Sequence, residues 1–111
     1  MDSILTSIKT MLGYSAEDTG YDEEIMMHIN AVLMDLTQMG VGPEEGFEID
    51  DAADQWDDFV SDVKKFAGIK TYVYMKMKLI FDDATMSSAL IDSYNRRIAE
   101  LEWRLTHAAE F

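Results

Sequence analysis

The sequence has no cysteine, one proline and two histidines. The absence of cysteine excludes disulfides and thiolate metal sites, and it leaves the redox compartment undetermined. No uninterrupted apolar run exceeds four residues, the length of Tyr72–Met75, so no segment is long enough to span a membrane. No basic stretch followed by an apolar stretch opens the chain. We therefore expect a soluble protein without a signal peptide that stays in the cell in which it is made.

Basic residues are almost missing from the first half of the chain. Between Thr10 and Val63 there is no lysine or arginine, whereas the same 54 residues contain 15 aspartates and glutamates. The first 63 residues contain one basic and 16 acidic residues, and the remaining 48 contain eight basic and six acidic residues. Their net charges are therefore −15 and +2, which together give the overall −13. Such a division of charge indicates what kinds of partner the protein can bind. The acidic part should repel nucleic acid, and the basic part could dock on an acidic surface, including another copy of the same chain.

Length and composition predict one domain, residues 1–111, with a modest core, because 48% of the 111 residues are hydrophobic. A core of this size leaves a role for a partner or an oligomer in stabilising the fold. The nine methionines suit surfaces that repack on binding.

Apolar residues at helical spacing, with glycines mostly at segment ends, predict an all-α fold. We expect a small bundle of about five helices with a long fourth and fifth helix. Asp2 or Ser3 can cap the first helix, Gly13 can end it in a left-handed conformation, and Asp22 can cap the second helix. A short extended piece is expected around residues 47–49. The expected helices cover approximately residues 2–12, 22–40, 52–60, 63–81 and 85–107.

The expected fourth helix is apolar on more than one side, which is typical of a helix that is central in its domain or lies in an interface. One stripe consists of Phe66, Ile69, Val73, Met77 and Ile80. The opposite stripe, which we expect to be core, consists of Tyr72, Met75 and Leu79. The fifth helix has a single apolar seam that consists of Leu90, Tyr94, Ile98, Leu101 and Leu105.

The acidic residues do not match a metal or catalytic site. Five aspartates lie between residues 50 and 58, but counting a calcium-binding loop from Asp50 places Ala52 at ligand position 3 and Gln55 at the glycine position. His28 and His107 lack metal-ligand spacing, and no serine or threonine has a nearby histidine to activate it. We therefore expect a solvated acidic face, no cofactor, no metal, no catalytic residue and no enzymatic activity.

A second face of the expected second helix is a candidate interface. Its members recur at positions i, i+4, i+7 and i+11 opposite the main apolar stripe, and they are Met27, Ala31, Met34 and Gln38. This pattern fits a subunit contact, scattered surface methionines, or a helix covered on both sides within the monomer. These alternatives are left open.

Trp103 is the second candidate, because it lies off the seam of the fifth helix and near Arg96 in projection. It either packs under a loop or forms an aromatic and arginine anchor at a protein interface, and we favour the anchor. The candidate interface on this helix comprises Arg96, Trp103 and Arg104.

Several segments resemble the phage head-tail connector family, the small adaptor proteins of tailed phages and prophages. They keep their order and spacing over most of the chain and comprise His28-Ile29-Asn30, Gln38–Pro43, Trp56-Asp57-Asp58-Phe59, Lys70–Lys76, Phe81-Asp82 and Ile98–Leu105. One departure is Asp82-Asp83-Ala84, where similar proteins are expected to have a proline. The loop before the fifth helix is therefore expected to be less rigid here.

The resemblance implies a structural virion protein with no catalytic residues to carry over. Such proteins are made in the host cytoplasm and assemble at the head-tail junction as a ring beneath the portal. A ring that matches the portal implies twelve subunits. They extend the DNA channel, through which DNA passes without specific binding, and they dock the next head-completion or stopper protein. No membrane is involved.

A DNA-mimic inhibitor of a host nucleic-acid enzyme is the alternative function, since the acidic half could imitate phosphates. The acids lack a regular spacing, however, and a mimic does not need the basic helices. An acidic helical scaffold or chaperone has no specific support in the sequence.

Overall fold

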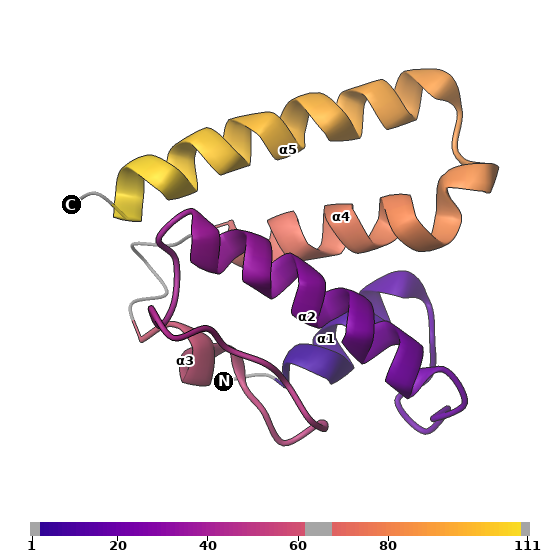
Figure 1. Cartoon of the computed structure of the whole chain (residues 1–111). Coiled ribbons are helices and arrows are strands. Elements are labelled where there is room, and N and C mark those ends of the chain that lie inside the picture. The colour runs from indigo at the N-terminus through magenta and orange to yellow at the C-terminus, as the bar shows by residue number, and fades with distance from the viewer. Residues whose placement is uncertain (1–2, 62–67, 110–111) are drawn as a thin grey trace.

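The structure is a computed structural model, and it describes residues 3–61 and 68–109. The described residues contain no β-strand, only an isolated bridge between Ser3 and Gln55. The predicted all-α fold with a long fourth and fifth helix is therefore confirmed (Figure 1). The helical elements are α1 (Ile4–Leu12), α2 (Asp22–Gln38), α3 (Trp56–Phe59), α4 (Ile69–Asp82), the 3-10 helix η1 (Asp83–Thr85) and α5 (Ser88–Ala109).

The ends of α1 are as predicted, and the start of α2 is not. Ser3 caps α1 by accepting a backbone N–H of the first turn, and Gly13 ends it with a left-handed φ of 92°. Asp22 does not cap α2: it is the first helical residue, and Tyr21 precedes it without a side-chain cap. The Asp22 carboxylate instead pairs with Lys9 of α1.

The third helix is much shorter than predicted, since it covers only Trp56–Phe59. The residues before it use their carboxylates for local turns that compete with a helix. Asp54 accepts the backbone N–H of Asp50 at 2.8 Å, and Asp51 accepts that of Ala53 at 2.8 Å. The expected extended piece at residues 47–49 forms no strand.

The other boundaries shift by a few residues. α2 ends at Gln38, not at Gly40, and α5 runs from Ser88 to Ala109. The part of the fourth helix expected at residues 63–67, with Phe66 in its apolar stripe, lies outside the described residues. At Asp82-Asp83-Ala84, where similar proteins are expected to have a proline, Asp82 ends α4 and Asp83 begins η1.

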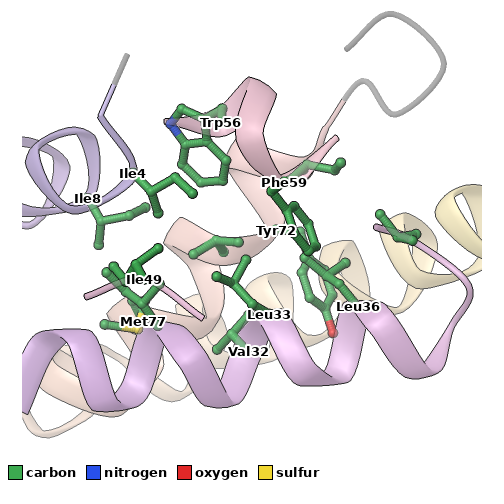
Figure 2. Packing of buried hydrophobic residues seen from close by; sticks show 14 of the residues in the cluster. Ile4, Ile8, Val32, Leu33, Leu36, Ile49, Trp56, Phe59, Tyr72 and Met77 are labelled. Carbon is green, nitrogen blue, oxygen red and sulfur yellow. The ribbon is translucent and has the colours of Figure 1, made fainter. Parts of the chain in front are cut away.

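The core lies where α1, α2 and α4 meet, and α5 packs along α4. α4 is central as its two apolar stripes predict: Tyr72, Val73 and Met77 are fully buried, and Met75 and Leu79 pack at the edge of the core. The buried side chains converge from α1, α2, α3 and α4, as Figure 2 shows. The Trp56 indole N–H donates to the Ser7 hydroxyl at 3.2 Å, so this ring is both buried and satisfied.

The seam of α5 is buried only in its second half, at Ile98, Leu101 and Leu105. Leu90 is 43% exposed, so its predicted place in a buried seam is wrong. Among the helices α1–α5 as the structure describes them, α4 runs beside this end of α5, and α1 and α2 lie on the other side of α4 (Figure 1). We call the hairpin of residues 80–97 the arm. It leaves apolar side chains in solvent, including Ile80 at 43% exposure.

Candidate functional site

The outer face of α2 is open to solvent. The four predicted residues on it, Met27, Ala31, Met34 and Gln38, are all exposed, with Met27 at 60% and Met34 at 56%. The main stripe of the same helix is buried. The helix is thus not covered on both sides in the monomer, which excludes one of the three interpretations. Surface methionines and a subunit contact both remain compatible with this exposure.

A groove of about 270 Å³ lies beside the C-terminal half of this face. It includes two of the predicted residues, Met34 and Gln38, but sequence reasoning missed its other wall. That wall is an acidic loop that turns back alongside α2. The lining consists of Asn30, Met34, Thr37, Gln38, Glu45, Gly46, Phe47 and Glu48.

Asn30 fixes the loop wall against α2. Its amide donates to the Ile49 carbonyl at 3.1 Å and accepts the Ile49 backbone N–H at 2.8 Å. Ile49 is buried, and the Phe47 ring packs against Phe59 with centroids 5.4 Å apart. The outer wall of the groove is therefore anchored at residues 47–49.

Replacing Asn30 with alanine should lower the free energy of unfolding by about 1–3 kcal/mol, because it leaves buried backbone groups of Ile49 unpaired. Asn30→Asp is the matched variant: it keeps the acceptor but sets a carboxylate against the Ile49 carbonyl. Its deficit should shrink as pH falls and the carboxyl becomes a donor. Urea denaturation of both variants and wild type at pH 7 and pH 4 measures this. Equal stability of wild type and both variants at pH 7 would contradict the role of Asn30 in fixing the loop against α2.

The outer face of α5 carries the second predicted set. Trp103 is 63% exposed, so the interpretation that it packs under a loop is wrong. Its indole stacks on His107, with ring centroids 4.0 Å apart, and His107 Nδ1 lies 2.7 Å from the Trp103 carbonyl oxygen. Arg96 and Arg104 are exposed on the same helix. This set lies on α5, which packs along α4, whereas the first set lies on α2.

Arg96 and Arg104 differ in their pairing from Lys76, Lys78 and Arg97. Within the described residues neither forms an ion pair inside the chain. By contrast, Lys78 contacts Asp82 at 2.6 Å, Arg97 contacts Glu100 at 2.9 Å, and Lys76 lies 3.9 Å from Asp35. The two arginines are thus available to an acidic partner.

Lys9, the one basic residue of the acidic half, is almost fully buried at 3% exposure. Its ammonium lies 2.8 Å from Asp22 Oδ1 and donates to the carbonyls of Asp18 at 2.6 Å and Ala16 at 3.3 Å. Among residues 3–61, therefore, no basic side chain faces solvent. The charge division seen in the sequence becomes a division of the molecular surface.

Tyr72 links α4 to α5 by donating its hydroxyl to Glu102 at 2.9 Å. Burial raises the pKa of Tyr72 well above its ordinary value, and the Glu102 carboxylate raises it further. The unfolded chain therefore loses this proton first as pH rises, at about pH 10. Binding fewer protons in the unfolded state makes stability fall with rising pH.

Wild type should consequently lose more unfolding free energy than Tyr72→Phe between about pH 9 and pH 11. Phenylalanine keeps the ring but has no proton to lose, so its pH dependence lacks this component. If urea denaturation shows that wild type and Tyr72→Phe lose the same unfolding free energy across this pH range, the raised pKa of Tyr72 is contradicted.

A groove of about 420 Å³ beside α1 carries several hydroxyls. Ser7 and Thr10 donate to carbonyls one turn earlier, and Ser7 also accepts from Trp56. Its lining consists of Ser3, Thr6, Ser7, Thr10, Met11 and Lys70.

The acidic side chains of the described ranges form no metal-binding group of three or more carboxylates and imidazoles. The aspartates of residues 50–58 include acceptors of backbone N–H groups, such as Asp58, which accepts from Gln55 at 2.8 Å. Within residues 3–61 and 68–109, no helix combines the length and apolar character that crossing a membrane requires.

Comparison with known proteins gives one match. A family model described as phage connector protein matches residues 4–111, almost the whole chain. No curated protein and no solved structure matches it. The match confirms the predicted resemblance, which rested on the order and spacing of short segments. The chain belongs to the phage connector protein family.

Proposed function

We propose that this protein is a structural, non-enzymatic component of the virion that forms a ring beneath the portal at the head-tail junction. The ring extends the DNA channel and docks the next head-completion or stopper protein. The observation that carries the proposal is the family match over residues 4–111.

Two structural features support assembly into a ring. The arm leaves apolar side chains such as Ile80 and Leu90 in solvent, where a neighbouring subunit could cover them. The acidic first half and the slightly basic second half, with net charges of −15 and +2, can meet head to tail, which is a heterologous contact that closes into a ring when the rotation permits.

The acidic surface also suits a DNA channel. A wall without exposed cations repels phosphates, so DNA passes without specific binding. We assign this role to residues 3–61, where no basic side chain is exposed. The α5 end, with its exposed Trp103, is assigned to the portal.

The test is reconstitution with purified portal protein, read by native mass spectrometry. We expect a ring of this protein on the portal, in register with the portal subunits. A monomer that does not bind the portal but binds a nuclease from the host would overturn the proposal in favour of a DNA mimic. Filled heads from a phage that lacks this protein provide the second readout, because adding the protein should restore attachment of the next head-completion protein.

A further inference from the structure

The lining of the groove beside α2 selects a particular kind of side chain. Met34 and Phe47 contribute apolar surface, and Glu45 and Glu48 contribute two exposed carboxylates. A partner that uses both needs a long aliphatic stem with a cationic end. Arginine fits best, because its planar guanidinium donates to carboxylates from two nitrogens at once.

The rim carboxylates have no competing cation in the same part of the molecule. Lys9 is the only basic residue before Val63, and it is buried against Asp22. Any lysine or arginine in the groove therefore comes from residues 64–111 of a chain or from another protein.

The arm presents such a cation. Arg96 is exposed, forms no ion pair among the described residues, and lies in the stretch 88–97 of α5, in which no residue is buried. Its neighbour Arg97 is already paired with Glu100. Exposed Leu90 and Ile80 lie on the same arm, so a contact here would bury apolar surface together with the charge.

We propose that the groove of one subunit receives Arg96 from the arm of a second copy of this chain. The inference rests on the proposed ring, since it names the residues that join one subunit to the next. Glu45 and Glu48 hold the guanidinium, and Met34 and Phe47 pack along the stem. The contact is heterologous, so each subunit offers its groove on one side and its arm on the other.

Charge reversal tests the contact on the portal. Glu45→Arg/Glu48→Arg and Arg96→Glu should each reduce ring formation at least tenfold, and combining all three changes should restore a large part of it. The matched control is Glu23→Arg/Asp57→Arg, which alters two exposed carboxylates outside the groove by the same net charge. The control should assemble nearly as wild type does. A control that fails equally, or a combination that shows no recovery, would overturn the proposal.

Crosslinking supplies a readout that does not depend on charge. The chain has no cysteine, so Glu48→Cys and Arg96→Cys each introduce a unique thiol. A short bismaleimide is suitable, because a direct disulfide needs Cα atoms within about 7 Å. A mixture of the two variants should give a covalent dimer when assembled on the portal, and Glu48→Cys mixed with Arg104→Cys should not. Rings without the first crosslink would overturn this contact but leave the proposed function intact. Absence of any ring with wild type would overturn both.

Discussion

Replacing Trp103 with alanine should leave the melting temperature close to that of wild type and should weaken binding to the portal about thirtyfold. The indole is 63% exposed and stacks on His107 of the same helix, so its loss opens no cavity in the core. At the centre of an interface, removing such a side chain typically costs about 2 kcal/mol or more. The expectation rests on the assignment of the α5 end to the portal.

Leu101→Ala is the control for this experiment. Leu101 lies two residues away on the seam, is 3% exposed, and closely approaches the backbone of Gly68. Truncating it should lower the free energy of unfolding by about 2–5 kcal/mol. Thermal melting and recruitment to filled heads should be measured for both variants. If Trp103→Ala melts normally and still joins heads with wild-type affinity, the portal anchor lies elsewhere.

The helices and the core were predictable because they depend on local periodicity. The stripe of α2 and the central place of α4 follow from spacings of three and four residues, which fix the buried face. The same periodicity wrongly predicted that Leu90 is buried. Periodicity says which side of a helix is apolar, but whether another element covers that side depends on the tertiary arrangement of α1 and α2 around α4.

The groove could not be predicted in the same way, because its wall depends on one long-range contact. Nothing local to Asn30 indicates that its amide pairs with Ile49, 19 residues later. The turn residues Gly40–Pro43 do indicate that the chain reverses after α2, which would bring the acidic segment back toward the helix. That signal was available, but it fixes neither the side of α2 nor the register.

The burial of Lys9 was not predicted for a related reason, although its position as the one lysine in an acidic half was a visible signal. A lysine is expected in solvent, so the sequence alone suggests a surface residue. The structure places its ammonium among one carboxylate and two carbonyls contributed by residues 16–22. The excess of acids around it supplies partners, and α1 supplies a position that faces the loop.

Lys9→Ala should therefore lower the free energy of unfolding by about 3–5 kcal/mol, because it leaves the Asp22 carboxylate without its cation. The Asp22 side chain is 21% exposed, but its Oδ1, the atom that Lys9 contacts, is buried and accepts no hydrogen bond, so water does not readily replace the lost partner. The carbonyls of Ala16 and Asp18 also lose their donor, which releases the loop between α1 and α2.

Two variants separate the charge from the packing of Lys9. Lys9→Met keeps most of the buried stem and removes only the ammonium, so it should lose less stability than alanine. Asp22→Asn keeps the two carbonyl bonds of the ammonium but leaves this buried cation without its anion, so its loss should be similar to that of Lys9→Met. Urea denaturation gives this order, and limited proteolysis at residues 13–21 reports the loop. If Lys9→Met is as stable as wild type, the attraction in the pair only offsets the cost of burying the charge. The role of Lys9 would then be to hold the loop in one conformation, and proteolysis of Lys9→Met should still be faster than that of wild type.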